Sequence, residues 1–147
     1  MRTVDVERTI AAPPADVFDW LTDVANYQRV PFVRRVTLVR PGNTAGNGVG
    51  AVRLVVTPLM RLTQEITEYD PPRLMRYRGL KSVPRLRHQE GSISCDPVGG
   101  GTLVRWSTTF EIAAPVLAPM WTFLAAPVVS LSFDMVLRTA ARELRGA

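Results

Sequence analysis

Six stretches with the character of β-strands follow one another between Val33 and Ile112, and a turn signal separates each from the next. Proline stands in every break, often beside glycine, asparagine or aspartate, while β-branched and apolar residues fill the stretches between. Consecutive strands joined by short connections pair antiparallel with their neighbours. We therefore predict an antiparallel meander with strands at 33–40, 49–57, 62–69, 74–80, 88–95 and 102–112.

The residues on either side of this meander predict one more strand and three helical segments. Apolar and polar residues alternate through 3–10, as in a half-buried strand. The prolines and aspartate of 13–16 suit the first turn of a helix, and a second short helix near 26–29 ends before Pro31. From 119 onward the apolar period is helical, with a kink or break expected at Pro127.

The predicted fold is therefore α+β: a curved antiparallel sheet of about seven strands around a long C-terminal helix, with two short helices after the first strand. At 147 residues, residues 1–147 form one predicted domain, long enough to bury most of the surface of its unfolded chain. A sheet that closes around one helix tends to leave a cavity between the two, and such sites are mostly apolar.

Eight residues are predicted to line this cavity and to bind an apolar ligand. Five share the phase that we assign to the concave face of the sheet, and three lie on the C-terminal helix. For each of the five sheet residues taken separately, simple core packing is the favoured explanation. The eight residues are Met75, Tyr77, Ile93, Trp106, Phe110, Met120, Trp121 and Leu124.

The loops at one end of the meander are unusual for connections because they combine apolar with basic residues. In a meander, successive connections alternate between the two ends of the sheet, so loops 57–61, 81–87 and 113–119 share one end. Apolar clusters with basic neighbours indicate a contact surface, although loops that cap one another would show the same pattern. We predict the cavity entrance here, formed by Leu59, Met60, Val83, Leu86, Val116 and Leu117.

The chain has one cysteine, Cys95, and one histidine, His88. A lone cysteine excludes an internal disulfide, and together the two residues leave no metal-ligand grouping and no Ser/His/Asp set with a spare partner. We therefore expect no metal and no cofactor. A solvated His88 at a strand start is favoured over a general acid.

The net charge of +5 is carried almost wholly by arginine. Such a charge suits nucleic acid, an anionic membrane or an acidic ligand, and a genome that favours arginine codons explains it equally well. Nucleic acid is the weakest of these because the basic loops are interleaved with aliphatic rather than aromatic residues. Charged residues among the first eight positions leave no signal-peptide core, which predicts a cytoplasmic protein.

Four segments in order resemble the START-like, or SRPBCC, superfamily: 10–18 (IAAPPADVF), 48–51 (GVGA), 68–74 (EYDPPRL) and 101–106 (GTLVRW). The resemblance spans nearly the whole chain and implies a helix-grip fold of the Bet v 1 type with an internal cavity. Its members look like polyketide cyclases or carriers of lipids and sterols. They share no single catalytic motif, so the resemblance assigns no catalytic residue here.

Two functions follow as hypotheses. The first is binding or transport of a lipid-like or polyketide-like molecule without chemistry. The second is an enzyme of the polyketide cyclase or aromatase kind, with Tyr77, Trp106, Arg8 or His88 as proton donor. The lack of an evident acid–base set favours the carrier, although shape and orientation alone can drive cyclisation. A protein-interaction or nucleic-acid module is a weaker alternative.

Residues 112–133 carry no charge, and they are apolar on nearly all sides before Pro127. Proline residues at 115, 119 and 127 interrupt the stretch, so we reject a membrane-spanning helix. One helix on one sheet buries only one face, and the surplus must face the cavity, a membrane or a second copy of the chain. Peripheral contact with an anionic membrane is favoured, with a homodimer as the alternative.

Overall fold

The structure is a computed structural model. It describes residues 2–30, 33–42, 48–57, 60–83, 86–112 and 118–145, and within these ranges the side chains of His88 and Trp121 are among those left undescribed. The predicted entrance residues Leu59, Val116 and Leu117 lie outside the described residues.

Seven strands form one antiparallel sheet, and a long helix follows them. The strands are β1 (Arg2–Ile10), β2 (Arg35–Arg40), β3 (Val52–Val56), β4 (Arg61–Asp70), β5 (Leu74–Val83), β6 (Leu86–Val98) and β7 (Gly101–Ile112). They lie in the order β1-β7-β6-β5-β4-β3-β2. The helical segments are α1 (Pro14–Thr22), the 3₁₀ helix η1 (Val24–Arg29) and α2 (Ala118–Arg145). The predicted fold, including the two short helices after the first strand, is confirmed.

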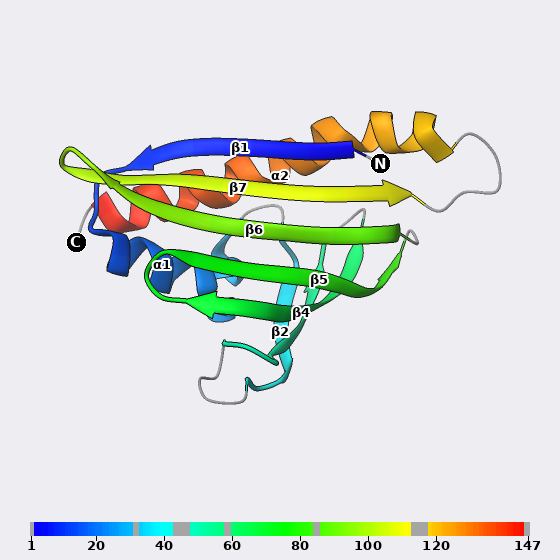
Figure 1. Ribbon diagram of the computed structural model, residues 1–147, viewed down its shortest axis with the longest axis horizontal. Coiled ribbons are helices and arrows are strands. Elements are labelled where there is room, and N and C mark those ends of the chain that lie inside the picture. The colour runs from blue at the N-terminus through cyan, green and yellow to red at the C-terminus, as the bar shows by residue number, and fades with distance from the viewer. Residues whose placement is uncertain are drawn as a thin grey trace.

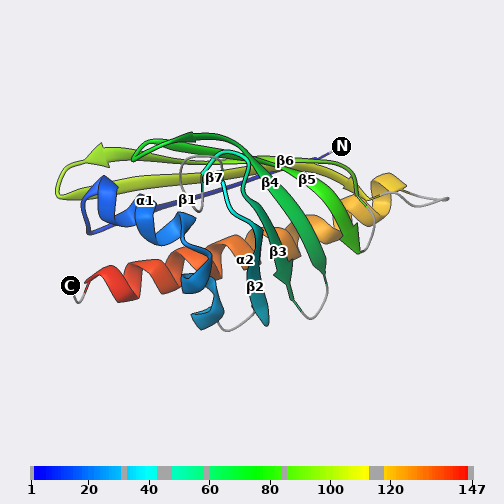
Figure 2. The same ribbon diagram turned by 90° about the horizontal axis from the view of Figure 1, so that it is seen from below.

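The sheet is curved, and its concave face covers α2. Figure 2 shows β2, β3 and β4 descending past one side of the helix, while β1 and β7 run along it. Register shifts interrupt the pairing of β4 with β5 at Thr63/Gln64 and Ile66/Glu68, and that of β2 with β3 at Leu38/Arg40. An extra residue on one strand bends it and increases its twist. These irregularities therefore help to turn the outer strands toward the helix.

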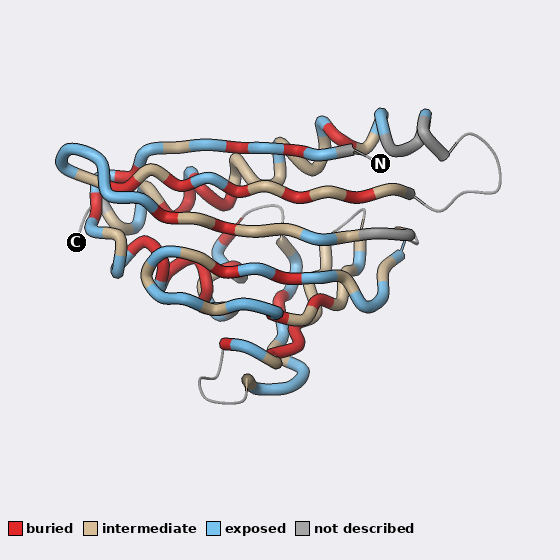
Figure 3. The backbone as a smooth tube through the Cα atoms, in the orientation of Figure 1, coloured by how far each residue is buried: buried red, intermediate tan, exposed pale blue. Residues whose placement is uncertain are grey.

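Buried residues alternate with more exposed ones along β7 and β1, as the colours of Figure 3 show, because successive residues of a strand face opposite sides of the sheet. Trp106 and Phe110 of β7 are buried, as predicted from their phase, while Arg105 on the opposite phase is exposed. Met75 pairs with Ile93, which in turn pairs with Trp106, so these three side chains form a continuous row across β5, β6 and β7. This row forms part of the core between the sheet and α2.

The helix α2 packs against β1 and β7 along the concave face (Figures 1 and 2). It continues through Pro127, so of the expected kink or break at that residue the break does not occur. Proline removes one backbone hydrogen bond, and here it lies on an exposed side of the helix, where water can satisfy the freed carbonyl. Phe123–Leu144 is long and apolar enough to cross a membrane, a test that core helices of soluble proteins also pass.

Candidate ligand cavity

A cavity of about 110 Å³ lies between the concave face of the sheet and the middle of α2. Every strand from β2 to β7 contributes to its wall. Most of the lining side chains are apolar. The described lining residues are Tyr27, Val33, Val36, Arg53, Val55, Thr57, Met60, Leu62, Gln64, Tyr77, Leu86, Gln89, Trp106, Thr108, Phe110, Val129, Ser132, Phe133 and Val136.

The predicted ligand-binding residues of the sheet fall into two groups. Tyr77, Trp106 and Phe110 line the cavity. Met75 and Ile93 are fully buried, with 0% exposed surface, but they pack within the core beside the cavity and do not form its wall. Alternation along a strand identifies the inner face, and it does not distinguish core packing from a cavity wall.

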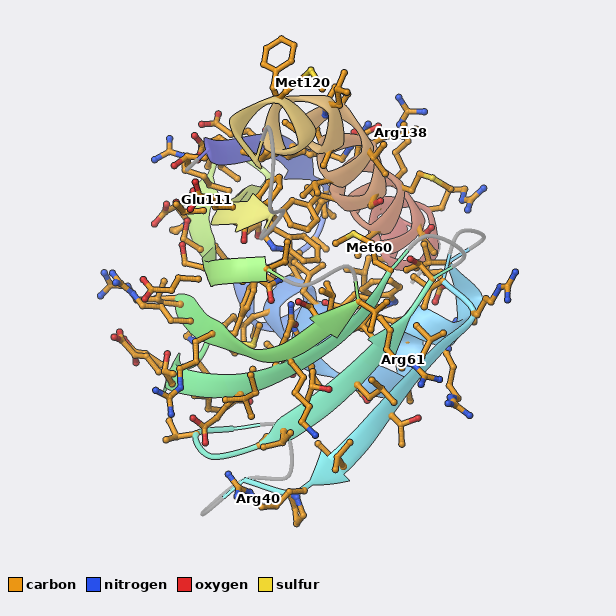
Figure 4. All side chains as sticks on the ribbon, turned by 90° about the vertical axis from the view of Figure 1, so that its right-hand side faces the viewer. Arg40, Met60, Arg61, Glu111, Met120 and Arg138 are labelled. Atoms are coloured by element: carbon orange, nitrogen blue, oxygen red, sulfur yellow. The ribbon has the colours of Figure 1, made fainter. Side chains whose placement is uncertain are left out.

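The predicted helix residues do not line the cavity, and this part of the prediction is wrong for Met120 and Leu124. Met120 is 44% and Leu124 54% exposed. The first turns of α2 project beyond the start of β1 in Figure 1, and Met120 points away from the sheet in Figure 4. The wall is instead formed by residues from Val129 to Val136, where α2 lies under the sheet. The Trp121 side chain lies outside the described residues.

Two of the predicted entrance residues, Met60 and Leu86, line the cavity. Figure 4 shows Met60 between α2 and the strands at the end of the molecule that carries the β3–β4 and β5–β6 connections. Val83 is 66% exposed and faces solvent at the end of β5, so it is not part of the wall. The antiparallel order places these connections at one end of the sheet, as predicted.

An aromatic group forms the part of the wall where β5, β7 and α2 meet. The Trp106 ring stacks on Phe133 of α2 with centroids 4.2 Å apart and planes 9° from parallel. The Trp106 indole Nε1 donates a hydrogen bond of 3.0 Å to the Tyr77 hydroxyl. Tyr77 lies across Gly91 of β6, where a Cβ atom would overlap the phenol ring. Because glycine has no Cβ atom, Gly91 leaves room for the Tyr77 side chain.

Arg53 of β3 lies in the wall, and the sequence analysis did not single it out. Only 4% of its surface is exposed. Its Nε donates a hydrogen bond of 3.2 Å to Gln64 Oε1, and its guanidinium carbon is 5.8 Å and 5.6 Å from the ring centroids of Tyr27 and Tyr77. It shares the phase of Val55, which also lines the cavity, but the strand is apolar on both faces, so alternation alone does not show which face is inward.

Burial makes the phenolic protons of both tyrosines of this group harder to remove. Desolvation raises the pKa of Tyr27 to about 12, although the nearby Arg53 guanidinium lowers it in part. Desolvation also raises the pKa of Tyr77, against the opposing effect of the hydrogen bond from Trp106. The Tyr27 hydroxyl donates to the Leu21 carbonyl, which fixes the ring.

The wall contains few other polar groups. Thr108 donates to the Glu90 carbonyl at 3.0 Å, and Ser132 to the Val128 carbonyl at 2.8 Å. Gln89 Oε1 is buried and has no hydrogen-bond partner among the described residues. The cavity thus offers an apolar wall with a few polar side chains, the composition typical of small-molecule sites.

The candidates for acid–base chemistry are dispersed. Arg8 lies outside the wall and forms an ion pair with Asp134 of α2 at 3.5 Å. The His88 side chain lies outside the described residues. No carboxylate belongs to the described part of the wall, and in the described parts of the chain no three His, Cys, Asp or Glu residues lie close enough to hold a metal. Tyr27 and Tyr77 are the phenols among the described lining residues, and the Tyr77 hydroxyl accepts a hydrogen bond from Trp106.

A curved antiparallel sheet that closes over a C-terminal helix and leaves a cavity between them defines the helix-grip class of proteins. The chain belongs to the polyketide cyclase / dehydrase and lipid transport family, whose model matches residues 1–145. The resemblance to the START-like superfamily is thereby confirmed. No curated protein matches the sequence.

Solved structures share the whole fold at low sequence identity. The protein TTHA0849 from Thermus thermophilus is 20% identical with a TM-score of 0.84 over 99% of this chain and 98% of its own. The ZhuI aromatase/cyclase from Streptomyces sp. R1128 is 22% identical with a TM-score of 0.82 over 98% and 93%. A START superfamily protein from Mycobacterium smegmatis is 13% identical with a TM-score of 0.79 over 98% and 97%. At these identities the likeness shows the fold.

Proposed function

We propose that this protein binds a hydrophobic small molecule, lipid-like or polyketide-like, in the cavity between sheet and helix, and carries it without changing it. The observation that supports this most is the wall itself, where the stacked Trp106 and Phe133 adjoin aliphatic side chains from β2, β3, β4 and α2. Buried apolar surface is the main source of affinity for such ligands.

The volume of about 110 Å³ is below the range of roughly 300–1,000 Å³ for drug-sized ligands. A larger ligand therefore requires side chains to move outward. Met60, at the end of the wall, is unbranched and adapts readily to new neighbours. Entry past this residue is consistent with the role proposed for this end of the sheet.

Titration with N-phenyl-1-naphthylamine, a neutral dye that fluoresces in apolar surroundings, tests the binding function. We expect saturable binding of one dye per chain, with quenching of tryptophan emission because Trp106 lines the cavity. Weak emission that rises linearly with dye and never saturates would remove the basis of the proposal.

Catalysis is the second candidate, favoured by the fold shared with an aromatase/cyclase and by the Tyr77 hydroxyl in the wall. Two observations count against it. Burial raises the pKa of Tyr77, which makes it a weak acid, and no described lining residue is a carboxylate that could act as its partner. An enzyme would return a cyclised or dehydrated product, whereas a carrier returns its ligand unchanged.

We also propose that the protein docks on anionic membranes to exchange its ligand. Met120, Phe123 and Leu124 are 44%, 58% and 54% exposed at the start of α2. The same end of the molecule presents Arg61 and Lys81, both exposed (Figure 4 shows Arg61). Apolar side chains inserted beside basic ones bind anionic lipid surfaces.

Flotation with liposomes tests this docking. We expect the protein to float with phosphatidylglycerol vesicles and to remain behind with phosphatidylcholine vesicles. Leu124→Glu should reduce the bound fraction several-fold because it adds a negative charge to the inserted surface. Val39→Glu is the matched control, since Val39 is 59% exposed on the distant strand β2.

Light scattering on the same samples separates docking from self-association. A monomer that ignores both kinds of vesicle would contradict the docking proposal. A dimer that Leu124→Glu dissociates would assign the exposed start of α2 to a homodimer interface instead.

A further inference from the structure

Arg53 is a buried cation whose charge is not balanced by the protein around it. It is 4% exposed, and it is the one charged side chain among the described residues of the wall. Removing a charge from water is costly unless an opposite charge or a full set of hydrogen bonds compensates it. The described wall of the cavity contains an arginine but no carboxylate that could balance its charge, so another source of compensation is needed.

The groups around Arg53 compensate it only in part. Gln64 accepts one hydrogen bond and is neutral. The rings of Tyr27 and Tyr77 provide cation–π attraction, and the Tyr27 hydroxyl interacts with the guanidinium as well. A guanidinium has five N–H donors; Gln64 accepts from one of them, and because Arg53 lines the cavity, a ligand there can reach the guanidinium.

The carboxylate that follows Gln64 on the neighbouring strand has other partners. Glu65 follows Gln64 on β4 and therefore points to the opposite face of the sheet. There it forms ion pairs with Arg40 at 3.0 Å and with Arg78 at 2.7 Å. Asp134 of α2 is likewise engaged by Arg8 and Arg138. The counter-charge of Arg53 thus has to come from outside the described chain.

We infer that the ligand is an apolar molecule with one carboxylate, and that Arg53 binds this carboxylate inside the cavity. This inference rests on the proposed binding function. Arginine and carboxylate form paired, charge-assisted hydrogen bonds that gain strength in a dry site. The flanking tyrosine rings hold the plane of the guanidinium, and Gln64 fixes its Nε end. The apolar body of the ligand then extends toward Trp106, Phe133 and the end near Met60.

Gln89 is an independent sign that the cavity is built for a ligand with polar groups. Its Oε1 is buried in the wall without a hydrogen-bond partner among the described residues. Buried acceptors are nearly always paired in folded proteins. A hydroxyl group on the same ligand would satisfy this oxygen.

Competition between two ligands that differ only in charge tests the inference. N-phenyl-1-naphthylamine reports occupancy of the cavity, and octanoate or octanamide is added to displace it at pH 7.5. We expect octanoate to displace the dye at a concentration at least tenfold lower than octanamide does. Arg53→Met should reduce this preference to less than threefold, and because both competitors displace the dye from the same variant, a change in dye affinity cancels from the ratio.

Two controls make the result specific. Arg40→Met removes a surface arginine whose side chain is 60% exposed, and it should keep the full preference for octanoate. The melting temperature of Arg53→Met should not fall, because replacing an unbalanced buried charge by an apolar side chain of similar length removes a desolvation cost. If Arg53→Met does not fold, Arg53→Gln serves in its place.

The outcomes separate this inference from the proposed function. Equal displacement by octanoate and octanamide in the unmodified protein, or an undiminished preference after Arg53→Met, would overturn the carboxylate inference and leave apolar binding in place. Failure of the dye itself to bind would overturn both.

Discussion

Trp106→Ala is expected to lower the free energy of unfolding by about 3–5 kcal/mol, the range found when a large buried aromatic side chain is truncated. Trp106 is 5% exposed and stacks on Phe133, so its removal opens a hole where the sheet meets α2. It also leaves the buried Tyr77 hydroxyl without its indole donor. Urea unfolding followed by circular dichroism measures the change.

Two further substitutions on β7 act as controls. Trp106→Phe keeps an aromatic ring against Phe133 and removes the hydrogen bond to Tyr77, so we expect a loss of about 1 kcal/mol from that bond with a further contribution from the smaller ring. Arg105→Ala, on the outer face, should cost roughly 0–1 kcal/mol because its pair with Glu7 is exposed. A loss below about 1 kcal/mol for Trp106→Ala would show that this stack does not join the sheet to the helix.

Val129→Trp is expected to reduce the affinity for N-phenyl-1-naphthylamine at least about thirtyfold, or about 2 kcal/mol. Val129 lines the cavity from α2, and an indole at this position would occupy the space that the dye requires. Because Val129 is only partly buried, the larger side chain should be accommodated at the cost of the cavity and not of the fold.

Leu131→Trp is the matched control for this substitution. Leu131 lies on the same helix two residues further on, is 59% exposed and does not line the cavity. The Leu131→Trp variant should bind the dye as tightly as the unmodified protein does. Loss of binding in both variants, or in neither, would mean that the dye does not occupy the cavity. Melting curves of both variants confirm that each is folded.

The strand pattern predicted the sheet well because proline marks every turn of the meander. Alternation along β7 also placed Trp106 and Phe110 on the inner face, since polar and apolar residues there are cleanly separated. Arg53 was missed for the opposite reason. Residues 51–56 (AVRLVV) are apolar on both faces of the strand, so the sequence does not show which face is inward. Only the curvature of the sheet places Arg53 inside.

The helix was harder to interpret than the strands. Its residues before Pro127 are apolar on nearly all sides, and a helix with no polar face gives no signal of which side packs. Leu124 was therefore placed in the cavity, although it is 54% exposed and does not line the wall. Which residues of α2 face the cavity depends on where along the sheet the helix begins. That starting point depends in turn on the connection before the helix.

The most direct test of a ligand held between sheet and helix is native mass spectrometry of the protein purified from its own host. We expect one apolar small molecule per chain on the unmodified protein and on Leu131→Trp, released unchanged by organic solvent. The same molecule should be absent from Val129→Trp, in which the indole fills the cavity. A protein that carries no such mass, or a Val129→Trp variant that carries it equally, would contradict binding in this cavity.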